Sequence, residues 1–296
     1  MSRKLIILIV TAALVLTAGS AAAFFENTMV SARARAMGES AVAVPGDAYP
    51  AFFNPGLLAV RTTGEAGASY VQPFGLEFND FYALGAVLPL QTRYGAIGVG
   101  LSQFKTSYQD VDLLKETQVT FSHGLTVFED FHSRVDMGYS INIYRVEQSE
   151  TVSGLNPGDD TVVGVDFGMA VNLHQRTTMG FLIKNMNNPQ IGLDEEELAR
   201  RLIAGVTYQP YEDVLTTFEI VNELGQDVQY HGGVEAMVVD SFYLRAGLVT
   251  HPNKLTAGFG YSRGRVSVDY GFGTGGGTLD ATHQFGVKVA WGGEAK

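Results

Sequence analysis

The sequence predicts an all-β protein: a transmembrane, antiparallel, up-and-down β-barrel of about 14 strands, with an N-terminal plug or periplasmic segment. Three observations predict it. Apolar side chains alternate with small or polar ones over most of the chain after residue 63. Most alternating segments are longer than the about 5–6 residues of a globular strand and approach the about 9–11 residues of a tilted membrane strand. Only 17% of the residues are charged, whereas soluble chains average about 25%.

Composition excludes several classes of protein. The 296 residues include no cysteine, which excludes a disulfide scaffold, a thiolate metal site and a cysteine nucleophile. The formal net charge is −11, and a nucleic-acid-binding protein would instead carry a basic surface. Mean hydropathy is nonetheless slightly positive at +0.08, so the apolar residues need an environment that accepts them.

Residues 1–23 have the pattern of a cleaved secretory signal peptide. Arg3 and Lys4 precede an apolar run over residues 5–16, and three alanines then offer a cleavage site before Phe24. The alternative is a membrane anchor, but the run is shorter than the about 20 residues that a spanning helix needs. We therefore expect export, and a location in the bacterial outer membrane.

Residues 24–63 do not alternate and form a separate segment. Small residues dominate its first half, and prolines and glycines interrupt its second half. Asn54 can cap a short helix that has Pro55 in its first position. We expect this segment either to plug the lumen of the barrel or to lie at its periplasmic mouth.

The barrel is expected over residues 64–292, where alternation has period two. Val163, Val165 and Phe167, for example, alternate with Gly164 and Asp166. Because successive side chains of a strand point to opposite faces, each such segment has one apolar face. The expected strands lie near residues 64–74, 79–90, 94–104, 116–126, 133–145, 161–173, 177–184, 200–208, 214–222, 227–238, 242–249, 254–261, 265–272 and 282–291.

The connections between these segments alternate in length. Long connections are expected at 105–115, 146–160, 185–199 and 273–281, and three-residue turns lie between many of the other segments. Outer-membrane barrels have short periplasmic turns and longer outer loops. We expect the same orientation here, with one helical turn between Asp194 and Arg201, where acidic residues come first and arginines last.

The polar faces of the strands supply the candidate lumen and ligand-binding residues. A membrane barrel turns its apolar face to lipid, whereas a soluble sandwich, the alternative, would bury that face in its core. The expected inward residues with charge are Arg134, Asp136, Asp166, Lys184, Arg201, Glu219, Glu235, Arg245, Arg265, Asp269 and Lys288.

Four short stretches of the N-terminal segment carry a resemblance. They are Ala-Arg-Ala-Met-Gly at 34–38, Ala-Val-Ala-Val at 41–44, Gly46-Asp47-Ala48, and Phe-Asn-Pro-Gly-Leu at 53–57. Together with the closing strand at 282–291, they resemble the PorV/PorQ-like and FadL-like outer-membrane barrels. The resemblance implies a 14-stranded barrel with an N-terminal plug, with Asp47, Asn54 and Pro55 as the plug motif. The chain departs from the family pattern in having Pro45-Gly46 where a paired aspartate is usual.

The resemblance implies two different functions. FadL-like members bind or pass small, hydrophobic molecules by capture at the outer face and movement of the plug. PorV-like members are non-conducting partners that collect secreted cargo for a type IX secretion machine. A third hypothesis is a subunit of a surface assembly that makes contacts through the long connections.

Motifs for catalysis or cofactor binding lack their context. Gly271 to Gly276 matches G-x-G-x-x-G, but no helix follows to hold a phosphate. The six histidines show no metal-ligand spacing. An inward Ser140 with Asp136 or Asp166 is conceivable as a hydrolase site but lacks a histidine. We therefore expect no catalytic residue, no metal and no cofactor.

Two further groups of residues concern the surface. Acidic residues gather in the long connections, either as a solvated rim or as a site for divalent cations shared with lipopolysaccharide. Aromatic residues near strand ends indicate girdles at the two membrane interfaces, or alternatively a stacking surface for a ligand. The aromatic set is Tyr70, Phe74, Phe81, Tyr82, Phe104, Tyr144, Tyr208, Phe242 and Trp291.

Overall fold

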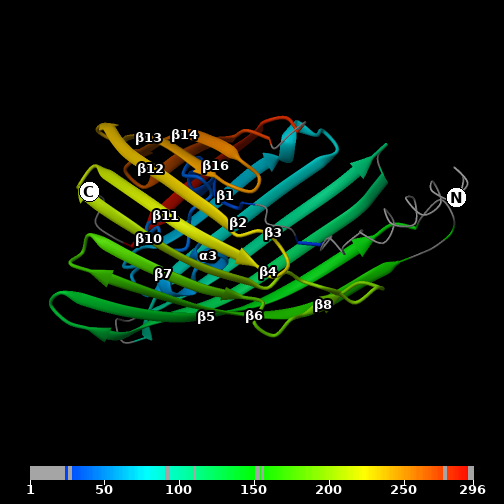
Figure 1. The fold of residues 1–296 in the computed structure, drawn as a ribbon, viewed down its shortest axis with the longest axis horizontal. Coiled ribbons are helices and arrows are strands. Elements are labelled where there is room, and N and C mark those ends of the chain that lie inside the picture. The colour runs from blue at the N-terminus through cyan, green and yellow to red at the C-terminus, as the bar shows by residue number, and fades with distance from the viewer. Residues whose placement is uncertain are drawn as a thin grey trace, which may run out of the picture.

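The computed structural model describes residues 24–25, 29–90, 94–109, 111–150, 154, 157–275 and 279–292. The signal peptide expected at residues 1–23 therefore lies outside the described residues. Figure 1 shows an open-ended tube of tilted strands with the N-terminal segment, in blue, inside it.

Fourteen strands close into one antiparallel barrel, in which each strand pairs with its neighbours in the sequence and β1 pairs with β16. This confirms the fold class predicted by the alternation. The strands of the barrel are β1 Gly64–Gln72, β2 Asn79–Pro89, β3 Ala96–Tyr108, β4 Val111–Glu129, β5 Ser133–Gln148, β6 Gly158–Leu173, β7 Thr177–Lys184, β10 Arg201–Tyr211, β11 Val214–Glu223, β12 Gln229–Val239, β13 Phe242–Val249, β14 Lys254–Arg263, β15 Val266–Gly273 and β16 Thr282–Trp291.

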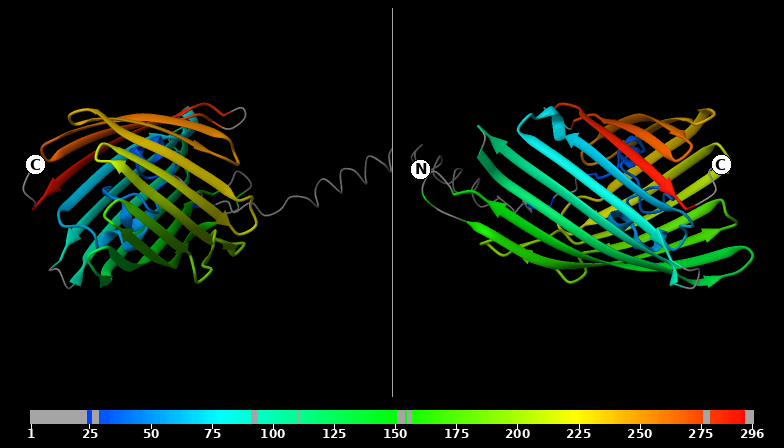
Figure 2. Two further views of the ribbon diagram at one scale, coloured as in Figure 1. Left: turned by 60° about the vertical axis from the view of Figure 1, so that its left-hand side comes forward. Right: turned by 180° about the vertical axis from the view of Figure 1, so that it is seen from behind.

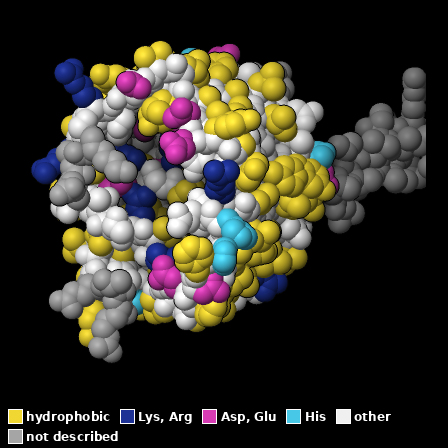
Figure 3. Space-filling model, turned by 90° about the vertical axis from the view of Figure 1, so that its left-hand side faces the viewer, with side chains coloured by type: hydrophobic (Ala, Val, Ile, Leu, Met, Phe, Trp, Pro, Cys, Tyr) yellow, Lys and Arg dark blue, Asp and Glu magenta, His cyan; other side chains and the backbone are white. Residues whose placement is uncertain are grey.

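Apolar side chains point outward from this tube, as the sequence predicts. On β5, Tyr139 and Ile141 are exposed, while Ser140 and Asn142, which alternate with them, are fully buried. Large hydrophobic side chains are exposed along most strands of the barrel. Figure 3, which faces the left-hand end of Figure 1, shows patches of hydrophobic side chains with charged side chains between them. Such a surface suits lipid and would be costly in water.

The inward face is less polar than we expected. Val71, Phe81 and Ala83 are buried inside β1 and β2, where they pack against Tyr49 and Phe52 of the N-terminal segment. The expectation of a uniformly polar lumen was wrong at these places, because the plug excludes water there and apolar contact stabilises the packing.

The strands alternate between short turns at one end, the short-turn end, and longer connections at the other, the long-loop end. The expected long connection at 105–115 was wrong, because β3 and β4 continue as a hairpin with only two residues between them. The connection at 185–199 contains the small sheet of β8 (Gln190–Ile191) and β9 (Glu196–Glu197) instead of the expected helical turn. Its backbone bonds across this hairpin, so the acidic run does not become helical.

Strand length varies strongly around the barrel. β4 has 19 residues and β5 and β6 have 16 each, whereas β13 and β15 have 8. The long strands, green in Figure 2, extend well beyond the yellow and orange ones at the long-loop end. The wall of the barrel is therefore much taller on the side of β4–β6.

The N-terminal segment enters the lumen and is buried there. It contains the short helices α2 (Ala32–Ala36) and α3 (Pro50–Phe53) and the 3-10 helix η1 (Pro55–Leu58). We call residues 29–61 the plug. None of the helices in the described residues is long and apolar enough to cross a membrane.

Candidate functional site

The plug touches the barrel wall through a belt of inward glycines. At each of them an added Cβ would come within 3.0 Å of a plug atom, of the plug backbone at some positions and of a plug side chain at others, so glycine allows the plug to approach this closely. The belt comprises Gly67, Gly85, Gly98, Gly100, Gly124, Gly138, Gly168, Gly180, Gly205, Gly233, Gly247, Gly258 and Gly271. The wall is thus shaped to hold this plug in this position.

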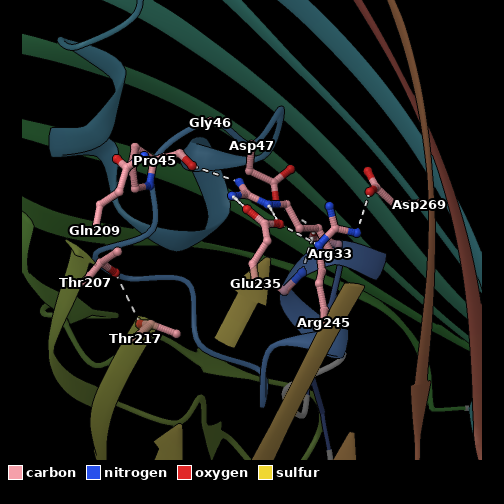
Figure 4. Close-up of polar contacts among 12 residues, drawn as sticks. Arg33, Pro45, Gly46, Asp47, Thr207, Gln209, Thr217, Glu235, Arg245 and Asp269 are labelled. Atoms are coloured by element: carbon pink, nitrogen blue, oxygen red, sulfur yellow. Dashed lines mark hydrogen bonds and ion pairs between the residues drawn. The ribbon is translucent and has the colours of Figure 1, made fainter. Parts of the chain in front are cut away.

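A network of buried ion pairs joins the plug to β12, β13 and β15. Arg33 donates through Nε and Nη2 to the two carboxylate oxygens of Glu235, at 2.8 and 2.7 Å. Arg245 donates to Glu235 at 2.6 Å and to Asp269 at 2.7 Å (Figure 4). Burial lowers the pKa of the Arg33 guanidinium, but Glu235 more than compensates, so this pKa lies above its ordinary value. Arg33 therefore stays charged, and the pair holds the plug.

Three more of the predicted lumen residues bind the backbone of the plug. Glu219 accepts the N–H groups of Ala41 and Val42 at 2.8 and 2.9 Å. Arg134 donates to the carbonyl oxygen of Ala59 at 2.6 Å, and Lys288 donates to that of Gly46 at 2.9 Å. These side chains satisfy polar groups of the plug that are buried away from water.

The three plug-motif residues organise the plug itself. Asn54 caps η1, whose first residue is Pro55, by accepting the N–H of Gly56, which confirms the predicted capped helix. Its amide also donates to the carbonyl oxygens of Val42 (2.7 Å) and of Met169 on β6 (3.0 Å). Asp47 accepts the hydroxyl of Ser31 at 2.6 Å. These contacts are structural.

The remaining predicted residues separate into different places. Asp136 accepts from Arg134, and Asp166 accepts from Asn142 and from the backbone of Asn185. Arg201 and Lys184 face the cavities described below. We expected Arg265 to line the lumen, and this expectation was wrong. Arg265 lies in the turn between β14 and β15 and is exposed.

A cavity of about 400 Å³ lies between the plug and the long-loop end. We call it the outer cavity. Three cationic side chains line it, from Arg35, Arg201 and Lys254, and three anionic ones, from Glu39, Glu116 and Glu223. Arg201 pairs with Glu223 at 2.6 Å, and Glu39 lies 3.6 Å from Arg35 and 3.5 Å from Lys254. Burial alone would raise the pKa of Glu39, but Lys254 and Arg35 hold it below its ordinary value.

A smaller pocket of about 60 Å³, the phenylalanine pocket, adjoins the outer cavity and reaches the plug. Phe104 and Glu116 line both spaces. The pocket is walled by five phenylalanines, with Val30, Ser102, Glu116, Gln118 and Lys184 completing it. The phenylalanines are Phe25, Phe52, Phe53, Phe81 and Phe104.

The sequence does not predict this pocket, because the position of Phe81, Phe104 and Tyr144 near strand ends indicates aromatic girdles instead. These assignments were wrong for Phe81 and Tyr144, which are 4% and 1% exposed, and for Phe104, which lines the pocket. Residues two apart on a strand point to the same face, and this alternation could have identified the two phenylalanines as inward. Phe81 and Phe104 share a face with Ala83 and Ser102, which the alternation places inward.

A third cavity of about 160 Å³ lies near the short-turn end, beside the Arg33 network. We call it the inner cavity. Its charged lining comprises Arg33, Arg245, Lys288, Glu235 and Asp269, with Tyr243 and Tyr261. The plug therefore separates two cavities that both carry charged groups.

Ser140 and the glycine motif of β15, the candidates for catalysis or cofactor binding, are part of the barrel wall. The hydroxyl of Ser140 lies 2.7 Å from that of Ser122 and 3.3 Å from the carbonyl oxygen of Ala51, so it contacts the plug. Gly271 and Gly273 lie in β15, and Gly276 lies outside the described residues. In the described part of the chain, no three His, Asp or Glu side chains gather as a metal site.

Comparisons with known proteins identify the same architecture. The toluene transporter TbuX of Ralstonia pickettii superposes with a TM-score of 0.61 at 14% identity, over 89% of this chain and 98% of that chain. The toluene transporter TodX of Pseudomonas putida gives 0.58 at 12% identity, over 90% and 98%. A FadL homologue of Pseudomonas aeruginosa gives 0.56 at 12% identity, over 90% and 99%.

These similarities establish the fold, which is that of the FadL-like outer-membrane barrels. They give no support to the resemblance to PorV/PorQ. No protein-family model and no curated protein matches this sequence.

Proposed function

We propose that this protein is an outer-membrane channel that passes small, largely hydrophobic molecules through a barrel with a movable plug. The observation that carries the proposal is that the phenylalanine pocket adjoins the outer cavity and ends on Phe52 and Phe53 of the plug. Buried aromatic side chains favour apolar ligands, and a pocket that ends on a plug is positioned to hand a ligand onward.

The fold and surface support the same proposal. The apolar outer surface suits the hydrocarbon layer of a membrane, and the barrel satisfies its backbone groups without open edges. The solved structures of this fold reported above include toluene transporters. Lipid and lipopolysaccharide are the proposed surroundings of the barrel, with the short-turn end facing the periplasm.

Passage requires the plug to move, because it separates the outer from the inner cavity. A disulfide between plug and wall tests this directly. The Cβ of Ala32 on α2 lies 3.5 Å from the position that a Cβ of Gly286 on β16 would occupy, which is within the Cβ–Cβ range of about 3.5–4.5 Å for disulfides. The chain has no native cysteine to interfere.

The experiment uses cells that carry the full chain in the outer membrane and measures their uptake of radiolabelled toluene. The double variant with Ala32→Cys and Gly286→Cys should pass toluene when reduced and not when oxidised. Each single variant should be insensitive to oxidant. The proposal is wrong if cells with the unmodified protein take up toluene no faster than cells without it. If the oxidised and the reduced double variant pass toluene equally, only the movement of the plug is contradicted, and the channel proposal is not.

A further inference from the structure

Lys184 is the last residue of β7 and lines the phenylalanine pocket. Five of the ten residues that line this pocket are phenylalanines, and Lys184 is the one cation among the other five. An ammonium group in such surroundings loses hydration and needs a compensating partner.

Lys184 makes no hydrogen bond and no ion pair within 4.0 Å to another described residue, and the carboxylates of Asp166 and Glu223 attract its ammonium only from a longer distance. Its neighbours are already engaged. Arg201, opposite Lys184 in the β7–β10 register, donates to Glu223 at 2.6 Å. Both carboxylate oxygens of Asp166 accept N–H groups, from Asn142 and Asn185.

The other carboxylate of the pocket, that of Glu116, is occupied as well. It accepts the backbone N–H of Phe25 at 3.1 Å. The free group that a ligand meets in this pocket is therefore a cation. A carboxylate is the complementary group, and its charge-assisted hydrogen bond with an ammonium is stronger than one between neutral groups.

The spaces on both sides of the pocket also suit a molecule with a charged group. The outer cavity carries three cationic and three anionic side chains, and the inner cavity carries three cationic and two anionic ones. The cations can bind a carboxylate in competition with these anions, whereas they offer a neutral hydrocarbon no comparable interaction. The volume of about 60 Å³ limits the apolar body to a compact one.

Resting on the function proposed above, we propose that the phenylalanine pocket selects compact aromatic carboxylates. The ring lies among Phe52, Phe53 and Phe81, and the carboxylate pairs with the ammonium of Lys184. Lys184 is thus the specificity-determining residue of the channel: aromatic carboxylates bind more tightly than neutral aromatics of the same size, which the channel still passes.

The test measures binding to the purified full chain in non-ionic detergent by isothermal titration calorimetry. The probes are benzoate and benzyl alcohol, which share a ring and differ in charge. Benzoate should bind at least about tenfold more tightly, since a hydrogen bond to a charged group is worth that factor or more. Lys184→Gln should remove this preference, Lys184→Arg should keep most of it, and benzyl alcohol should bind both variants within about twofold of the unmodified chain.

Lys105→Gln is the matched control, because Lys105 pairs with Asp112 outside the pocket at 2.7 Å. It should leave benzoate binding unchanged. The inference is overturned if benzoate binds no better than benzyl alcohol, or if Lys184→Gln leaves the preference intact. In that case, binding and uptake of neutral aromatics would leave the proposed channel standing. If neither probe binds and toluene uptake also fails, the channel proposal falls as well.

Discussion

Arg33 of the plug and Glu235 of the barrel wall form a buried ion pair with two parallel hydrogen bonds, although 202 residues separate them in the sequence. Two parallel N–H···O bonds fix orientation as well as distance. This pair is therefore a specific point at which the wall recognises the plug.

Arg33→Ala should loosen the plug. It leaves the carboxylates of Glu235 and Asp269 to share Arg245, so one buried negative charge is no longer balanced, and an unbalanced buried charge costs about 3–5 kcal/mol. We expect larger and more frequent openings in planar-bilayer conductance recordings. Arg145→Ala is the control, because Arg145 pairs with Glu147 and Asp159 in an exposed position. Equal conductance of the two variants would contradict an anchoring role for Arg33.

Substitution by alanine should affect the two neighbouring glycines of β12, Gly232 and Gly233, to different extents. A Cβ at Gly233 would clash with the backbone of Met37, whereas the atom nearest to a Cβ at Gly232 is 3.9 Å away. Gly233→Ala should destabilise the protein by about 1–3 kcal/mol through overpacking, and Gly232→Ala should change stability little. The midpoint of guanidinium unfolding, followed by the single tryptophan, Trp291, measures both. Similar midpoints would show that the plug is not held against β12.

Asn54→Asp should be more damaging than Asn54→Ala. Alanine removes hydrogen bonds to Gly56, Val42 and Met169 and leaves these groups unsatisfied, at about 1–3 kcal/mol each. Aspartate has no N–H to donate and brings a buried negative charge against two carbonyl oxygens. Trypsin cleavage at Arg35 of the plug reports the release. Asn187→Ala, in the exposed connection after β7, should leave that cleavage unchanged, and a reversed order of the Asn54 variants would refute this account.

Acid should weaken the contact between plug and wall at Glu39. The folded-state pKa of Glu39 lies below its ordinary value of 4.5, so its pairing with Lys254 and Arg35 stabilises the fold fully above about pH 4.5. This stability is lost as the pH falls through the lower folded-state pKa. Unfolding midpoints between pH 6 and pH 3 should fall more steeply for the unmodified chain than for Glu39→Gln. His231 also faces Glu39, so His231→Gln is the second arm and should keep the steep fall.

The strands were predictable from the sequence because alternation is a local property. Each of the 14 expected segments contains or overlaps one strand of the barrel. The connection at 105–115 failed for a physical reason. Its residues, such as Lys105 and Thr106, lack apolar alternation, yet backbone pairing with Leu114 and Lys115 continues the hairpin.

The candidate site was predictable only in part. Parity alone identifies Glu219, Glu235 and Arg245 as inward. Their partners could not be predicted, because contacts such as that between Glu219 and Val42 join residues 177 positions apart. The phenylalanine pocket combines residues of the plug with residues of several strands, so no local sequence pattern predicts it.

The unequal strand lengths determine how molecules reach the protein from outside. At about 3.3 Å per residue, the 19 residues of β4 extend about 60 Å, whereas the 8 residues of β13 extend about 26 Å. The long-loop end of the barrel is therefore oblique: the wall is high at β4 to β6 and low at β12 to β15. In the proposed orientation, solutes that collect at the cell surface enter over the low side at β12 to β15 and meet the high wall of β4 to β6, whose Glu116 and Gln118 line the phenylalanine pocket.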